Sequence, residues 1–174
     1  MDLPKRRRVL NSFQIIVLGF AGVILLGALL LMLPVSSASG SATPFVNALF
    51  TSTTSVCVTG LVVYDTATYW SGFGHAVILV LIQIGGMGVV TVAASFAMIS
   101  GRKIGLFQRS TMQEAMAAPK MSGIVRLTNF IVRTTILIEL LGAAVMAPVF
   151  CRDFGVGRGL WMALFHSVSA FCNA

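Results

Sequence analysis

Residues 13–33 read FQIIVLGFAGVILLGALLLML, an apolar stretch without a charged side chain. About 20 apolar residues in an α-helix are enough to cross the roughly 30 Å hydrocarbon core of a bilayer. Residues 73–99 and 127–150 have similar length and composition, with only a few polar positions in each. We therefore predict three membrane spans and an all-α integral membrane protein.

The composition of the whole chain agrees with this prediction. Of its 174 residues, 57% are hydrophobic and only 10% are charged, and the mean hydropathy is +0.94. Soluble domains are about one-quarter charged, so a water-soluble globule is excluded. The net charge of +7 does not indicate a nucleic-acid binder, because the basic residues form short runs between long uncharged stretches. Cys57, Cys151 and Cys172 lack the spacing of a disulfide framework or a zinc site.

The basic runs predict how the chain is oriented in the membrane. Four basic residues precede the first span: Lys5, Arg6, Arg7 and Arg8. Five more lie between the second and third spans: Arg102, Lys103, Arg109, Lys120 and Arg126. Residues 33–72 contain no Lys or Arg. Because short cytoplasmic loops are enriched in Lys and Arg, we expect the N-terminus and residues 100–126 inside and residues 34–72 outside.

Residues 44–64, PFVNALFTSTTSVCVTGLVVY, are also apolar enough to enter the membrane. If they crossed it, the basic stretch 100–126 would lie outside. We therefore predict that they enter and leave on the same face as a re-entrant loop. Non-helical backbone at membrane depth is tolerated only beside protein or a water-filled cavity, and the hydroxyl-rich residues 51–55 suit such a cavity.

The first half of this loop predicts a short helix. Ser41 or Thr43 can cap its start, with Pro44 in the first turn, and the helix would end near Thr54. A helix C-terminus carries roughly half a negative charge. Since no basic side chain follows in the loop, this end favours cations.

The chain matches itself without gaps at an offset of 115 residues. LLGA at 25–28 recurs at 140–143, and ALF at 48–50 recurs at 163–165. Ser52 matches Ser167, and Cys57 matches Cys172, in line with a repeated unit of span, re-entrant loop and span.

The repeat predicts how the chain is divided. We expect a cytoplasmic N-terminus at 1–12, a first unit at 13–99, a cytoplasmic link at 100–126 and a second unit at 127–174. Because 127–174 is shorter than a unit, we expect the chain to be part of a longer polypeptide.

Residues 55–61, SVCVTGL, carry the predicted function. A cation leaves its water shell only where a ring of oxygens replaces it, and successive backbone carbonyls can supply them. Turning such carbonyls to one side requires unusual backbone angles, which glycine adopts readily. Gly60 is therefore the expected pivot, with Val58 and Thr59 as carbonyl donors.

The chain resembles the membrane subunits of bacterial Trk/Ktr-type potassium uptake systems. The shared stretches are Leu-Pro after the first span, ALFTSTTSVCVTGLVVYDT at 48–66, LIQIGGMG at 81–88, GRKIGL at 101–106 and LFHSVSAFCNA at 164–174. This resemblance implies a K⁺-channel-like, pseudo-fourfold pore made by four such units of one polypeptide in the bacterial plasma (inner) membrane.

The resemblance also assigns residues and partners. It implies K⁺-binding backbone carbonyls at Val58, Thr59, Gly60, Asn173 and Ala174, flanked by Cys57, Leu61 and Cys172. In that family, glycine at the Gly60 position accompanies potassium selectivity, and serine in related plant transporters accompanies sodium. It further implies a homodimer with a cytoplasmic nucleotide-binding regulatory subunit of the RCK/KTN type, and no organic cofactor or further metal.

Three alternatives stay open at this point. The transporter could carry or couple to Na⁺, or the chain could be a non-conducting structural membrane subunit. A membrane-embedded enzyme is disfavoured, because there is no G-x-S-x-G, and His166 and Ser167 are helix neighbours that point apart. We expect Arg133 to extend to the cytoplasmic interface and Glu139 to bond another helix, with Gln83 as a residue able to bond across helices.

Overall fold

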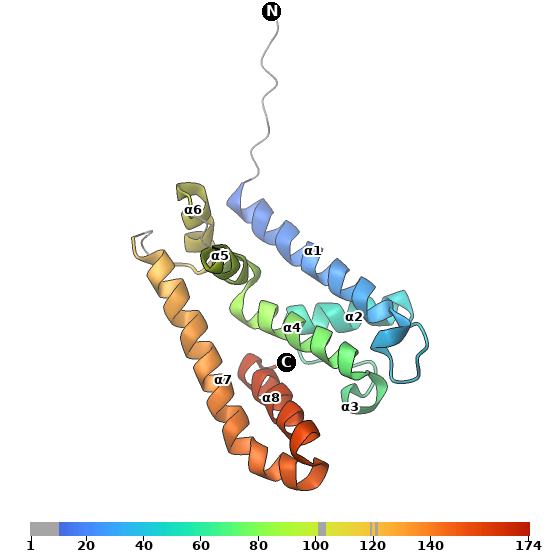
Figure 1. Cartoon of the computed structure of the whole chain (residues 1–174). Coiled ribbons are helices and arrows are strands. Elements are labelled where there is room, and N and C mark those ends of the chain that lie inside the picture. The colour runs from blue at the N-terminus through green and yellow to red at the C-terminus, as the bar shows by residue number, and fades with distance from the viewer. Residues whose placement is uncertain (1–10, 101–103, 119, 121) are drawn as a thin grey trace, which may run out of the picture.

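The computed structural model describes residues 11–100, 104–118, 120 and 122–174 (Figure 1). The basic run 5–8, Arg102 and Lys103 lie outside the described residues. In chain order the helices are α1 Ser12–Met32, η1 Pro34–Ser36, α2 Phe45–Val56, α3 Thr66–Tyr69, α4 Gly72–Met87, α5 Val89–Ile99, α6 Leu106–Ala115, α7 Ile124–Phe154 and α8 Val156–Cys172. The described part of the chain contains no strand, only an isolated bridge between Ser37 and Trp70, so the all-α prediction is confirmed.

Two helices, α1 and α7, are long and apolar enough to cross a membrane. Helix α1 covers the predicted first span almost residue for residue and ends just before Pro34, which cannot donate the next backbone hydrogen bond. Helix α7 has 31 residues and extends beyond the predicted span 127–150 at both ends. Pro148 lies inside this helix without ending it.

The predicted span over 73–99 is not one unbroken helix. The chain forms α4 and α5 there, with a bend of 98° between them. The break falls at Gly88, whose φ of +83° is a left-handed conformation that favours glycine. A crossing by this part of the chain therefore requires a broken pair of helices.

The predicted cap of α2 is also wrong in detail. Pro44 is the residue that precedes the helix, and no side chain caps the first turn. The hydroxyl of Thr43 instead lies 3.2 Å from the hydroxyl of Tyr69. The helix itself is present, and it runs two residues past the predicted end at Thr54.

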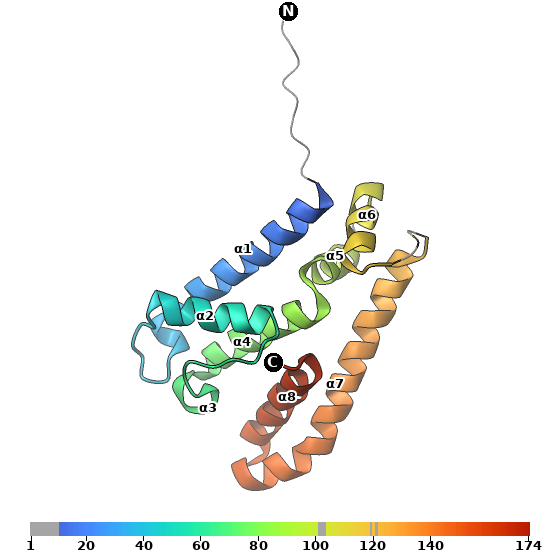
Figure 2. The ribbon, with the colours of Figure 1, turned by 180° about the vertical axis from the view of Figure 1, so that it is seen from behind.

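Helix α2 folds back beside α1 and α4, and α8 folds back beside α7 (Figures 1 and 2). A core cluster joins these pairs: Leu31, Ala48, Val56, Trp70, Ile78, Leu81, Ile82, Val168 and Cys172. The short helix η1, which follows α1, is held beside the start of α4, because Ser71 donates its backbone N–H to Ser36 O at 2.9 Å. The chain thus brings two short helices, α2 and α8, onto the same helix α4.

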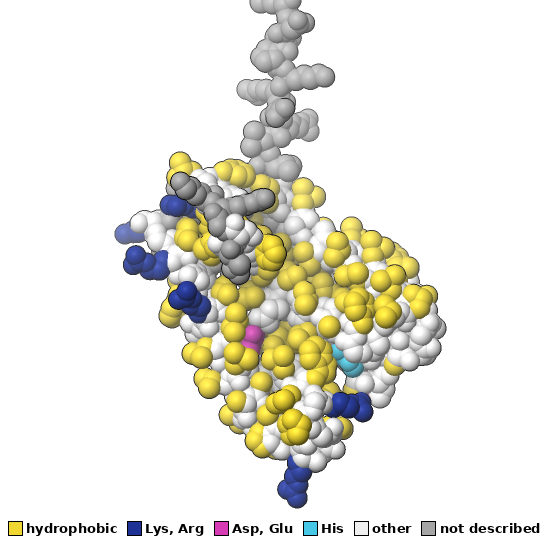
Figure 3. All heavy atoms as spheres, viewed as in Figure 1, with side chains coloured by type: hydrophobic (Ala, Val, Ile, Leu, Met, Phe, Trp, Pro, Cys, Tyr) yellow, Lys and Arg dark blue, Asp and Glu magenta, His cyan; other side chains and the backbone are white. Residues whose placement is uncertain are grey.

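The outer faces of α1 and α7 are apolar. Large hydrophobic side chains that are more than half exposed include Leu18, Leu25, Leu26 and Leu29 on α1, and Leu137, Leu140, Leu141 and Val145 on α7. Yellow side chains accordingly dominate the face in Figure 3, while Lys and Arg gather near α6 and at the opposite end of the molecule. Such continuous apolar surface on long helices is typical of contact with lipid or with further membrane helices.

Glycine allows α1 and α2 to approach closely. A Cβ atom placed on Gly27 would lie 2.5 Å from Ser52 Oγ and 2.7 Å from Leu81 Cδ2, much closer than van der Waals contact. In the open space beside Gly22, on the same helix, an added Cβ has no atom within 4 Å. The same substitution at Gly27 and at Gly22 therefore distinguishes a loss of packing from a change in helix propensity.

We expect Gly27→Val to lower the free energy of unfolding by about 1–3 kcal/mol, the usual effect of overfilling a packed interface. The measurement is the thermal unfolding midpoint of the purified protein in detergent. Gly22→Val is the matched control and should leave the midpoint near that of the wild type. Equal losses in both variants would contradict the packing explanation.

Candidate functional site

The segment that follows α2 has an unusual backbone. Cys57 ends the helix, Val58 has φ +56° and Gly60 has φ +69°. The positive φ at Gly60 was expected, but at a β-branched residue such as Val58 it is strained. Strain of this kind persists only where the surrounding structure holds it. The part that Val58, Thr59 and Gly60 play in ion binding stays a prediction.

Thr54 fixes this segment to its own helix. The Thr54 hydroxyl oxygen accepts a hydrogen bond from the backbone N–H of Leu61 at 2.8 Å and lies 2.6 Å from Thr59 Oγ1. The backbone N–H of Thr59 donates to Thr54 O at 3.0 Å. A single buried threonine thus bonds both ends of the turn.

The segment that follows α8 has the same local geometry. Asn173 has φ +61°, and it matches Val58 at the offset of 115 residues. The backbone N–H of Ala174 donates to Ser169 O at 3.0 Å, just as Thr59 bonds Thr54. The Ser169 hydroxyl also donates to Ala174 O.

The same offset relates the contacts in the second half of each short helix. Ser52 Oγ donates to Ile24 O at 2.7 Å, and Ser167 Oγ donates to Glu139 O at 2.6 Å. A Cβ on Gly142 would overlap Ser167 Oγ, as one on Gly27 would approach Ser52. Each serine therefore docks its short helix onto the preceding long helix through a glycine gap.

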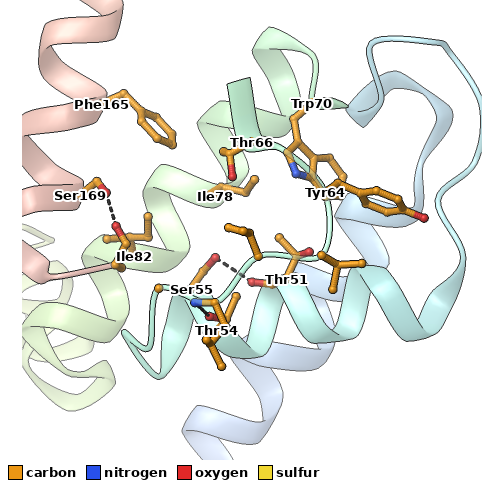
Figure 4. Close-up of a pocket in the computed structure, with 15 residues that line it drawn as sticks. Thr51, Thr54, Ser55, Tyr64, Thr66, Trp70, Ile78, Ile82, Phe165 and Ser169 are labelled. Carbon is orange, nitrogen blue, oxygen red and sulfur yellow. Dashed lines mark hydrogen bonds between the residues drawn. The ribbon is translucent and has the colours of Figure 1, made fainter. Parts of the chain in front are cut away.

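The two segments meet. An added Cβ on Gly60 would lie 3.8 Å from Asn173 O and 3.8 Å from the carbonyl carbon of Ala174. Beside this contact lies a cavity of about 200 Å³, lined by α2, α4, α8 and the loop that follows Gly60 (Figure 4). Figure 4 shows Phe165 and Ser169 of α8 across the cavity from residues of α2. None of the lining residues is charged.

The polar groups around the cavity present oxygen atoms. Thr51 Oγ1 donates its hydrogen to Asn47 O at 2.9 Å, and Ser55 Oγ donates to Thr51 O at 2.7 Å. Both residues line the cavity, and because their hydrogens are donated elsewhere, their oxygens can still act as acceptors. The C-terminal ends of α2 and α8 both lie here, and helix C-termini carry partial negative charge. This environment favours a cation over an anion.

Helix α4 packs against the C-terminal ends of both α2 and α8. A Cβ on Gly85 would overlap Val56 O, and one on Gly86 would overlap Cys172 Sγ. Gly85 and Gly86 therefore allow this close packing, whereas Gly88 ends the helix. Val58 and Ala174 pack partly against the core cluster, while the Cys57, Thr59 and Leu61 side chains are exposed.

Other polar residues near the site have structural partners. His75 Nε2 lies 2.6 Å from Thr66 O, and His166 Nδ1 lies 2.8 Å from Met162 O. In the described part of the chain, no three His, Cys, Asp or Glu residues are grouped as metal ligands. Gln83 Nε2 donates to Glu139 Oε2 at 3.1 Å, which confirms that Glu139 bonds another helix.

Sequence reasoning missed the roles of Thr54 and Ser169. Both lie within hydroxyl-rich stretches, and both match one another at the offset of 115 residues. That shared offset was the available signal, because a hydroxyl retained at the same place in both copies suggests a shared contact.

The chain is similar in sequence to known cation transport proteins. A model of the TrkH cation transport protein family matches residues 3–174. The chain is 41% identical to the potassium/sodium uptake protein NtpJ of Enterococcus hirae over 176 residues, covering 100% of this chain and 39% of that protein. It is 42% identical to the Ktr system potassium uptake protein B of Bacillus subtilis over 161 residues, covering 92% of this chain and 36% of that protein. The chain thus spans about two-fifths of the length of these relatives.

We expect Thr54→Val to loosen the turn, because valine keeps the shape of threonine but cannot accept a hydrogen bond from Leu61. Amide hydrogen exchange around residues 59–61 should become faster by about tenfold, the factor that one lost hydrogen bond of ~1.4 kcal/mol implies. The measurement is exchange detected by mass spectrometry in detergent.

Thr53→Val is the matched control for this variant. The Thr53 hydroxyl bonds Leu49 O within α2, and it makes no contact with the turn. Exchange at 59–61 should stay at the wild-type rate in this control. Unchanged exchange in Thr54→Val itself would show that the turn does not depend on Thr54.

Proposed function

The chain belongs to the family of TrkH cation transport proteins, and from that membership we propose that it forms part of a K⁺ uptake pathway. In this proposal the pathway crosses the plasma membrane of a bacterium, and the segments after α2 and α8 are two parts of its selectivity filter. The filter ligands are backbone carbonyls of Val58, Thr59 and Gly60 in the first segment and of Asn173 and Ala174 in the second.

One observation carries the proposal. Two helix C-termini, followed by left-handed turns of the same geometry, meet beside an uncharged cavity with several hydroxyl groups in its lining. A dehydrated K⁺ requires such oxygens at close range and no competing cation. The contacts that recur at 115 residues support the view that each segment belongs to one unit of span, pore loop and span.

The remaining parts of the pathway are proposed by likeness to the family. Two segments supply only part of a ring of oxygens, so we propose that further units of the same transporter complete a pseudo-fourfold pore. We also propose a homodimer that binds a cytoplasmic nucleotide-binding subunit of the RCK/KTN type. The basic stretch 100–126, which contains α6, is the part of this chain proposed to face that subunit.

Transport of Na⁺ is the second candidate, because one relative is named as a potassium/sodium uptake protein. The identities of 41% and 42% to the two kinds of relative do not separate these functions. The resemblance to potassium uptake systems, in which glycine at the Gly60 position accompanies potassium selectivity, favours K⁺ in our proposal.

We expect Gly60→Ser to raise Na⁺ uptake relative to K⁺ uptake by about tenfold, a change of ~1.4 kcal/mol in relative ion binding. A side chain at φ +69° strains the turn and shifts the neighbouring carbonyls. The measurement is uptake of both ions by the intact transporter in a bacterium that lacks its own K⁺ uptake systems.

Gly40→Ser is the matched control, because Gly40 has φ +70° but lies in the loop before α2, and an added Cβ there meets no atom within 4 Å. This variant should keep the wild-type ratio of K⁺ to Na⁺ uptake. If Gly60→Ser also kept it, Gly60 would not set selectivity.

The proposed topology puts α6 inside the cell and the loop before α2 outside. In a transporter without its native cysteines, Gln108→Cys should react with a membrane-impermeant maleimide only after the membrane is opened. Ser41→Cys should react in intact cells. External labelling at residue 108 would refute the topology and, with it, the re-entrant path of residues 44–64.

A further inference from the structure

Glu139 is a buried acid in the middle of α7. Only 5% of its surface is exposed, and its Oε2 accepts a hydrogen bond from Gln83 Nε2 of α4 at 3.1 Å. Within the described residues its other oxygen, Oε1, has no hydrogen-bond partner. A buried acceptor without a partner lowers stability by about 1–3 kcal/mol, so a second role must explain this side chain.

The first unit shows that the carboxyl group is not needed for docking the short helix. Ile24 occupies the matching position 115 residues earlier, and its backbone carbonyl accepts the Ser52 hydroxyl as Glu139 O accepts Ser167. The side chain of Glu139 therefore adds a contact that the first unit lacks. That added contact is the bond to Gln83.

The bond to Gln83 joins α7 to the helix that supports both segments. Gln83 precedes Gly85 and Gly86, which pack directly on Val56 and on Cys172. On the other side, the backbone of Glu139 holds Ser167, one and a half turns before the end of α8. The pair thus connects α4, which packs against the end of α2, to α7, which holds α8.

We propose that the hydrogen bond between Glu139 and Gln83 is a positioning contact that sets the spacing of the two segments and thereby the preference for K⁺ over Na⁺. This inference rests on the proposed function. Selectivity depends on oxygen positions within a few tenths of an ångström, because the carbonyls must replace a water shell of one size. A small shift of α4 against α7 and α8 changes the distance between Gly60 and Ala174.

Removing the whole hydrogen bond gives this proposal a distinct signature. Replacing both partners of a buried hydrogen bond by apolar side chains of similar shape can be nearly neutral for stability. The double variant Glu139→Leu/Gln83→Leu should therefore keep a thermal midpoint near that of the wild type, while it lowers selectivity. A purely structural role predicts that stability and selectivity fall together.

The test is competition between K⁺ and Na⁺ uptake by the intact transporter, with the thermal midpoint measured for each variant. Glu139→Leu and Gln83→Leu should each lower the K⁺ preference by about two- to tenfold, the range of one hydrogen bond. The double variant should be no worse than either single one, since both remove the same bond. Glu139→Gln keeps an acceptor for Gln83 and should stay within about twofold of the wild type.

Asn129→Leu is the matched control, because Asn129 is an exposed polar residue of the same helix. It should keep the wild-type preference. A wild-type preference in well-folded Glu139→Leu, or effects of the two single variants that multiply, would overturn the positioning role. If Glu139→Leu does not fold, an unchanged preference in Gln83→Leu overturns it alone. A wild-type transporter that carries neither ion would instead refute the proposed function.

Discussion

The close approach of α4 to the ends of α2 and α8 is the constraint on which the rest of the arrangement depends. Gly85 and Gly86 leave no room for a side chain against Val56 O and Cys172 Sγ. Because consecutive residues of α4 touch the ends of both short helices, the position of α4 affects both segments. Val58 and Asn173 lie just after these contacts and have left-handed backbone angles, and the surrounding packing holds the strained backbone of Val58.

Hydroxyl groups hold the site together without introducing charge. Ser52 and Ser167 dock the short helices, while Thr54 and Ser169 bond the turns that follow them. A charged side chain in the same places would be costly in a membrane and would compete with a bound ion. Thr51 and Ser55, which line the cavity, donate to backbone carbonyls within α2, so their oxygens can still accept, which keeps the cavity neutral but suited to a cation.

Much of this arrangement could be predicted from sequence, because it depends on local and periodic signals. The apolar stretch of α1, the short helix α2 and the repeat at 115 residues are of this kind, and the positive φ at Gly60 follows from residue type. The bend at Gly88 could not be predicted. Residues 85–88 include three glycines, and each of these can either allow close packing or break the helix. Which of them packs is decided by Val56 and Cys172, residues far away in sequence. The Thr43 contact to Tyr69 depends on tertiary structure in the same way.

The differences between the two copies are as informative as their likeness. The first long helix ends before Pro34, whereas α7 continues through Pro148 to Phe154, so α8 begins directly after Gly155 while α2 follows a loop. The docking contacts themselves are unchanged, because they use backbone carbonyls that any residue supplies. The side chain at the docking position can therefore differ between the copies: it is Ile24 in one and Glu139 in the other. A repeat built on backbone acceptors and small residues can keep its shape while individual side chains, such as Glu139, take on contacts between the copies.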